Sequence, residues 1–130
     1  MLWPKMTEGD RLALVDKTWE ELGHKVRAIR YMTWVRTLPF PEKTAGGILL
    51  PPKLQSFHGE LPHLQNVRGV VVSTGPVGAA RDMKVGELVE FQRLHFAYYK
   101  KLREGDGEEY VGWIDANQIL WKVTDEDEGA

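Results

Sequence analysis

The sequence predicts one all-β domain, and three observations lead to this fold class. Several short runs rich in β-branched and aromatic residues are separated by turns that contain glycine or proline. The chain shows no alternation of strand and helix patterns of the kind that βαβ units need. At 130 residues it is long enough for one hydrophobic core. We therefore expect a β-barrel or a β-sandwich.

Residues 1–24 predict a helical extension that precedes the β domain. Apolar residues recur there at spacings of three and four, which is the period of one helix face. These residues are Leu12, Val15, Trp19 and Leu22. Thr7 and Asp10 resemble a capping box and Gly23 is a typical stop signal, so the helix should run from about Glu8 to Leu22. A helix this short needs a surface, which should be its own domain or a neighbouring subunit; a separate partner or a membrane is the alternative.

The β domain should begin with the segment from Lys25 to Leu38. This segment alternates loosely and is rich in β-forming residues, which predicts one or two strands with a bend near Arg30 and Tyr31. Pro39 should end the strand, because proline lacks the backbone N–H that a ladder needs and restricts the residue before it.

A long loop is expected next, over residues 41–67. Gly46 and Gly47 loosen its backbone, and Pro51 and Pro52 prevent it from continuing as a central strand. Three large aliphatic residues stand between these pairs, and they are Ile48, Leu49 and Leu50. Consecutive side chains of a strand point to opposite faces, so these three cannot all face one core. We therefore expect a flexible loop that offers an apolar tip to a partner.

The rest of the chain predicts further short strands. Residues 70–72 are three consecutive valines bounded by glycines, which is typical of a buried strand. In a strand from Val85 to Phe91, the side chains of Val85, Val89 and Phe91 should share one face. The remaining expected elements are an aromatic and lysine-rich segment at Gln92–Lys101, a hairpin turn at Arg103–Gly107, a strand at Glu109–Trp113, a short turn at Asp115–Gln118, a last strand at Ile119–Val123 and an acidic tail at 125–130.

Composition argues against several classes of function. A net charge of -2 speaks against nucleic acid as the main partner, because phosphate-binding surfaces are usually basic. The absence of cysteine excludes disulfides and thiolate metal sites and fits a reducing cytoplasm. His58 and His63 lack further ligands at metal-site spacing, so we expect no bound metal. No apolar run reaches the length of a membrane span, and the first residues do not resemble a signal peptide.

Four segments carry short motifs in a fixed order. The first is KTAGGILL at Lys43–Leu50. The others are RGVVVSTG at Arg68–Gly75, MKVGELVEF at Met83–Phe91, and DGEEYV at Asp106–Val111 followed by Asp115–Leu120. Each motif is short, but together they resemble the GroES-type co-chaperonins over roughly residues 25–123.

The resemblance implies a fold and an assembly. The fold would be an irregular GroES-like β-barrel over residues 25–124, with the mobile loop at 41–67. The assembly would be a homo-heptameric ring, in which the last strand at Ile119–Val123 pairs with the first strand, at Val26–Val35, of a neighbour. Only Pro76–Asp82 stands where the family usually has a longer roof hairpin, so the roof should be cut back, as in some virus-encoded members.

The resemblance also implies a function. The chain would be a co-chaperonin that caps a GroEL-type chaperonin, encloses an unfolded client protein and assists its ATP-dependent folding. The residues that would bind the chaperonin are Ile48, Leu49 and Leu50. Those that would form the hinge of the loop are Thr44, Ala45, Gly46 and Gly47.

Three further expectations come with this resemblance. An aromatic side chain should face the inside of the ring, and the candidates are Phe96, Tyr98 and Tyr99. The chain should have no catalytic site and no cofactor of its own, because the chaperonin binds the ATP. It should work in the cytoplasm, which would be the host's if the protein is virus-encoded.

Two other classes of function have some support in the sequence. The aromatic residues beside lysines from Phe96 to Lys101 could serve an OB-like domain that binds single-stranded nucleic acid, because bases stack on such rings. Medium-chain alcohol dehydrogenases use the same barrel in their catalytic domain, but this chain has no cysteine, no zinc-ligand pattern and no second nucleotide-binding domain.

Overall fold

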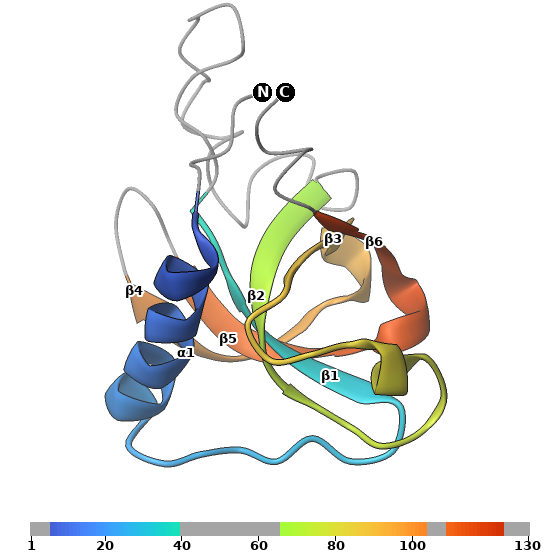
Figure 1. The fold of residues 1–130 in the computed structure, drawn as a ribbon, viewed down its shortest axis with the longest axis horizontal. Coiled ribbons are helices and arrows are strands. Elements are labelled where there is room, and N and C mark those ends of the chain that lie inside the picture. Colours follow the sequence, from blue (N-terminus) through green and yellow to red (C-terminus); the bar gives the residue numbers. More distant parts are fainter. Residues whose placement is uncertain (1–5, 40–65, 104–108, 124–130) are drawn as a thin grey trace, which may run out of the picture.

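A computed structural model describes residues 6–39, 66–103 and 109–123. In this part of the chain, one α-helix packs on one curved sheet of six strands (Figure 1). The main elements are α1 (Glu8–Leu22), β1 (Met32–Thr37), β2 (Asn66–Thr74), β3 (Leu88–Gln92), β4 (Ala97–Arg103), β5 (Glu109–Asp115) and β6 (Ile119–Val123). Short 3-10 helices lie at Gly78–Asp82, Arg93–His95 and Ala116–Gln118. The expectation of a mostly β domain with one helix is confirmed.

The sheet is antiparallel throughout, and its strands lie in the order β4-β5-β1-β2-β3-β6. In the described part of the chain no ladder joins β4 to β6, so the sheet is open and does not form the closed barrel that the resemblance implies. The register shifts twice between β4 and β5 and once between β3 and β6. Such bulges bend and twist both edge strands.

The helix agrees with its sequence signals at both ends. Thr7 and Asp10 form a capping box, in which each side chain accepts a hydrogen bond from the other residue's backbone N–H at 3.1 Å. Gly23 ends the helix in the left-handed conformation, with a φ of 84°. Val15 and Leu22 are buried against the sheet, so the helix covers its own domain as expected. Leu12, by contrast, stays exposed beside Gly86.

Acid should loosen the start of α1. The backbone N–H of Thr7, then its hydroxyl, and the charge of Arg11 lower the pKa of the exposed Asp10 carboxyl. A carboxyl whose pKa is lower in the folded protein stabilises the fold above its unfolded pKa of about 3.9. That contribution is lost as the pH falls through the folded pKa. An NMR titration should therefore give Asp10 a midpoint below about 3.9, and Thr7→Ala should raise it. Equal midpoints in the two proteins would contradict this role of the cap.

The two faces of the sheet bury two separate apolar clusters. One cluster lies between the sheet and α1, and its buried members are Val15, Leu22, Leu38, Val70, Val72, Leu88, Val111 and Val123. The other lies on the opposite face of the strands, and its buried members are Val35, Val67, Val71, Val89, Phe91, Phe96, Tyr110 and Ile114. Because β1, β2 and β5 are covered on both faces, consecutive residues are buried along them without a clean alternation.

Several expected boundaries were wrong. Residues 25–29 form no strand, and β1 begins only after a turn in which Arg30 adopts a φ of 56°. The bend near Arg30 is thus confirmed. Val85 lies exposed in a turn, because Gly86 adopts a φ of 95° and the strand starts only at Leu88. Val89 and Phe91 do share a face.

The last expected elements agree closely with the structure. β4 and β5 pair antiparallel, with Arg103 opposite Glu109, whereas residues 104–108 of the expected hairpin turn lie outside the described residues. A 3-10 helix follows β5, and the Asp115 carboxylate accepts a hydrogen bond from the backbone N–H of Asn117 at its start. β6 has the expected bounds, Ile119–Val123. The acidic tail lies outside the described residues.

Candidate functional site

The predicted partner-binding loop leaves the domain from the paired ends of β1 and β2. Thr37 lies opposite Gly69 in this ladder, and the backbone N–H of Leu38 donates to the carbonyl oxygen of Arg68 at 2.8 Å. We call residues 37–39 and 66–69 the loop base. Residues 40–65 lie outside the described residues. They include the expected tip, Ile48, Leu49 and Leu50, and the expected hinge, Thr44, Ala45, Gly46 and Gly47.

The loop base corrects one boundary of the predicted loop. Asn66 and Val67 belong to β2, where they pair with Gln92 and Phe91 of β3, and Val67 is fully buried. The polar side of this strand end is also fixed, because Arg68 donates from Nε to the Glu90 carboxylate at 2.8 Å. The predicted loop therefore begins and ends on strands that the sheet holds in place.

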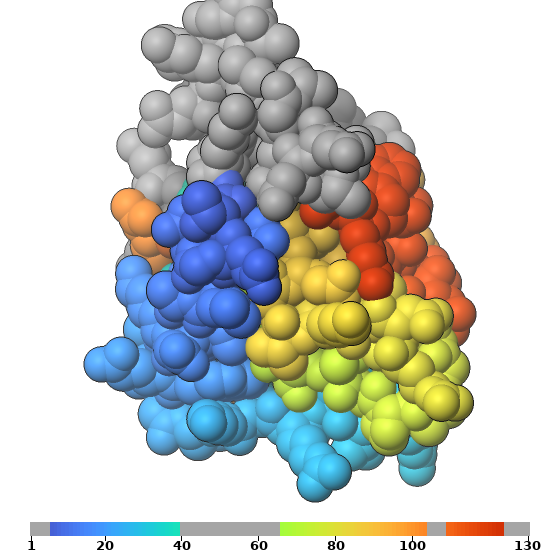
Figure 2. All heavy atoms as spheres, in the orientation of Figure 1, coloured from blue at the N-terminus to red at the C-terminus, as the bar shows by residue number. Residues whose placement is uncertain are grey.

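Helix α1 covers the loop base from one side. Leu38, the residue after β1, is buried in the same apolar cluster as Val15 and Leu22 of the helix. Figure 2 shows α1 lying along the surface beside the segment that precedes β3. There the Arg11 Nε donates to the carbonyl oxygen of Gly86 at 2.8 Å. The helix is thus fixed to the sheet near both of its ends.

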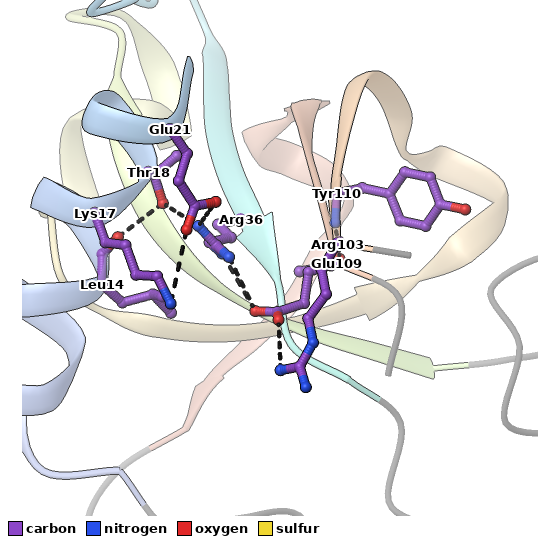
Figure 3. Close-up of polar contacts among 9 residues, drawn as sticks. Leu14, Lys17, Thr18, Glu21, Arg36, Arg103, Glu109 and Tyr110 are labelled. Atoms are coloured by element: carbon purple, nitrogen blue, oxygen red, sulfur yellow. Dashed lines mark hydrogen bonds and ion pairs between the residues drawn. The ribbon is translucent and has the colours of Figure 1, made fainter. Parts of the chain in front are cut away.

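A buried arginine joins this helix to the sheet. Arg36 of β1 is 1% exposed, and its guanidinium lies between Glu21 of α1 and Glu109 of β5 (Figure 3). Its Nη1 is 3.2 Å from the Glu21 carboxylate and 3.2 Å from the Thr18 hydroxyl. Its Nε and Nη2 are each 3.3 Å from one oxygen of Glu109. We call these four residues the Arg36 cluster.

The polar groups of the Arg36 cluster have partners on four elements, α1, β1, β4 and β5. The Thr18 hydroxyl accepts from Arg36 and donates to the carbonyl oxygen of Leu14 at 2.7 Å. The second oxygen of Glu109 accepts from Arg103 at 3.4 Å, and Glu21 also pairs with Lys17. Sequence reasoning missed this cluster, because its members come from segments far apart in the chain. The one local signal was a charged residue inside an otherwise apolar strand.

The three aromatic candidates have different surroundings. Phe96 is buried in the core and stacks on Phe91, with ring centroids 5.4 Å apart, so its ring faces no open surface. Tyr98 and Tyr99 are each about half exposed. Tyr98 packs against the core residue Tyr110, at 5.3 Å between centroids. That leaves Tyr98 and Tyr99 as the candidates for an aromatic residue that faces a cavity.

Tyr99 belongs to a second aromatic group on the helix side of the sheet. Its ring meets Trp34 edge-on at 5.5 Å, and Trp34 lies 5.2 Å from its cross-strand partner Trp113. Tyr98 instead contacts a residue of the opposite cluster. The two neighbouring tyrosines therefore do not form one continuous stacking platform.

The two edge strands of the sheet differ in character. β4 carries two bulges and the lysines Lys100 and Lys101, features that discourage pairing with another chain. β6 lies at the other edge and exposes Leu120 and Trp121. Lys122, between these residues and Val123, is held by the Glu87 carboxylate and the carbonyl oxygen of Asp82. Both edges expose large side chains, but β6 has one register shift where β4 has two and lacks the lysine pair, so β6 is the edge better suited to a partner.

Part of the expected subunit interface is corrected by the sheet topology. β1 pairs with β2 on one side and β5 on the other, so residues 32–35 have no free ladder for a neighbouring subunit. Residues 25–29, which are in no strand, include the well-exposed Ile29. If the predicted pairing occurs, it must use these residues.

Neither a metal site nor a comparison with known proteins assigns a function to this chain. Within residues 6–39, 66–103 and 109–123, no group of three histidine, cysteine or acidic residues could hold a metal ion. The described helices include none that is long and apolar enough to cross a membrane. No protein-family model matches the chain, and no curated protein matches it either.

Proposed function

We propose that this chain is a co-chaperonin that caps a GroEL-type chaperonin and so assists ATP-dependent folding of an enclosed client protein. The observation that carries the proposal is the KTAGGILL run at Lys43–Leu50, within a segment whose two ends leave from a paired β1–β2 hairpin. A firm base beneath a glycine-containing segment with an apolar tip suits a loop that a partner must capture. The mostly β fold is compatible with a GroES-like domain, and the proposal is that this domain keeps the open six-stranded sheet of the described residues.

The free energies of burying the tip and of ordering the loop explain why such a loop would act as part of a ring. Full burial of Ile48, Leu49 and Leu50 would gain about 1.5–3 kcal/mol each, or roughly 5–9 kcal/mol together. Ordering nine residues around them costs about 1–2 kcal/mol each, or roughly 9–18 kcal/mol. One loop alone therefore binds weakly even with new hydrogen bonds. Several loops on one ring raise the effective concentration and bind well together, yet can all release when the partner's grooves move.

The proposed assembly is a homo-heptamer closed by strand pairing. The exposed edge of β6 would accept residues 25–29 of a neighbouring subunit, which hides the edge of each sheet. Tyr98 or Tyr99 would face the client cavity, and ATP would stay with the chaperonin. The short segment Gly78–Asp82 at the expected roof would leave a wider opening at the top of the ring. The site of action would be the cytoplasm.

Native mass spectrometry tests the ring and the partner together. We expect a seven-subunit species that joins a GroEL-type chaperonin only when nucleotide is present. A monomer or dimer that ignores the chaperonin would overturn the proposal. Salt-dependent binding to single-stranded DNA would then support the OB-like alternative, although the separation of Tyr98 from Tyr99 weakens that alternative.

A charge at the loop tip should abolish chaperonin binding. Leu49→Asp or Ile48→Asp places a carboxylate where an apolar groove must receive the side chain, which costs far more than the burial it replaces. The ring should persist, since the tip is not part of the core. Leu94→Asp is the matched control, because Leu94 is an exposed leucine of the described domain. Loss of the ring in the tip variants, or loss of binding in the control, would contradict the proposal.

A further inference from the structure

Helix α1 contacts Arg36, which directly precedes the loop base, and shares an apolar cluster with Leu38 of the loop base. At the end of β1, Arg36 and Leu38 both face the helix side of the sheet. Arg36 contacts α1 directly, and Leu38 lies in the same apolar cluster as the helix. Among the described residues, the N–H of Leu38 also makes the β1–β2 hydrogen bond nearest to the predicted loop. The contacts of α1 thus extend along β1 to Arg36, and its apolar cluster extends to Leu38, three residues before the predicted loop.

These contacts are polar as well as apolar. Apolar packing only keeps α1 against the sheet, whereas the directional polar contacts also fix where along β1 the helix lies. Thr18 and Glu21 are one turn apart on α1 and approach the same Arg36 nitrogen at 3.2 Å. From the other side, Glu109 of β5 holds the guanidinium at 3.3 Å. β1 is therefore held between a helix and a strand within two residues of Leu38. Sliding or fraying of this strand end would break directional contacts with a buried charge.

The opposite end of the same strand pair has a different kind of anchor. There the backbone N–H of Gly75 donates to the carbonyl oxygen of Met32 at 2.9 Å, and the close backbone of Arg30 leaves no room beside Gly75. Neither feature involves α1. The helix is thus placed to influence one end of the β1–β2 hairpin selectively, the end that bears the predicted loop.

We propose that α1 is a positioning element for the loop, which holds the loop base so that a partner has fewer residues to order when it binds. This inference rests on the proposed function for its consequence, but not for its structural content. Each further residue that must be ordered on binding weakens a single loop by roughly 5-fold. A loosened loop base would therefore lower the affinity for the chaperonin without any change at the apolar tip.

The test removes the Thr18 hydroxyl that accepts from Arg36 and the negative charge of Glu21 that pairs with it, and it keeps the shapes of both side chains. In Thr18→Val/Glu21→Gln, Arg36 retains Glu109, so the sheet should stay folded; Glu21→Gln alone is the milder variant. Glu20→Gln is the matched control, because Glu20 is exposed, neighbours Glu21 and loses the same charge. Hydrogen exchange of the full-length protein is measured at the Leu38 and Gly75 amides. Binding to a GroEL-type chaperonin with ATP is measured in parallel.

The expected result is selective. The Leu38 amide should exchange at least about 5-fold faster in the double variant, the Gly75 amide should keep its rate, and the chaperonin affinity should fall several-fold while the ring stays intact. Unchanged Leu38 exchange, equal acceleration at both amides, or faster exchange with unchanged affinity would overturn the positioning role. If the unaltered protein fails to bind any such chaperonin, the proposed function falls, and the exchange rates alone still decide whether α1 holds the loop base.

Discussion

Replacing Arg36 by methionine should lower the free energy of unfolding by about 3 kcal/mol. Removing one member of a buried ion pair costs about 3–5 kcal/mol, because the remaining charge stays buried without compensation. Here Glu109 is the stranded charge, since its side chain is only 9% exposed, whereas Glu21 is 30% exposed and can be hydrated. Arg103 still contacts Glu109, which puts the loss at the lower end of that range. Urea denaturation followed by tryptophan fluorescence measures it.

Two further variants separate the charge effect from lost packing. Arg36→Met combined with Glu109→Gln neutralises the stranded carboxylate, so it should recover at least about 1 kcal/mol relative to Arg36→Met alone. Arg103→Met removes the other partner of Glu109, but the Arg103 side chain is 62% exposed, so the loss should stay below about 1 kcal/mol. Equal losses for the Arg36 and Arg103 variants would show that burial does not govern this cluster.

Replacing Gly112 by alanine should cost more than about 3 kcal/mol or prevent folding. Gly112 lies in β5 between β1 and β4, opposite Val35 and Tyr98. A Cβ built there would stand 2.6 Å from the Tyr98 Cα and 2.8 Å from the Phe96 ring, and closer still to the carbonyl oxygen of Ala97. Backbone atoms cannot yield as a flexible side chain can, so β4 must shift and Phe96 must leave its stack on Phe91.

Gly78→Ala provides the control for this prediction. Gly78 has a φ of 60°, and a Cβ there would meet nothing closer than the Tyr31 Cβ at 4.0 Å. Its replacement should therefore cost only the left-handed backbone strain, about 1–2 kcal/mol. Chemical denaturation of both variants gives the comparison. A Gly112→Ala loss no larger than the Gly78→Ala loss would show that β4 and β5 do not approach so closely.

Local signals predicted the elements whose structure depends on local chemistry. The capping pair Thr7 and Asp10 and the stop at Gly23 defined α1 to the residue, because a helix end is decided by which nearby groups satisfy its free N–H and C=O groups. β6 was predicted equally well. The strand before Phe91 was predicted to start too early, because the alternation of Val85 with Val89 continues through a turn that Gly86 allows.

The candidate site also has a part that the sequence reveals and a part that only the structure reveals. The motif at Lys43–Leu50 is visible in the sequence, but it lies outside the described residues, and its role stays a prediction. The sequence also offered Phe96 and Tyr99 as equivalent candidates. The structure separated them, since Phe96 fills the core and Tyr99 lies on the helix side of the sheet. Alternation along the strand places Phe96 and Tyr99 on opposite faces, but which ring is buried depends on the residues that cover it after the chain has folded.

The sequence by itself determined the class of the fold, the bounds of α1 and β6, and the apolar run that motivates the proposed function. Only the tertiary structure decided that α1 shares an apolar cluster with Leu38 and that Arg36 is buried between Glu21 and Glu109. The physical reason is separation along the chain. Capping and strand periodicity act within a few residues, whereas a buried charge finds its partners only after the helix, β1 and β5 have packed together.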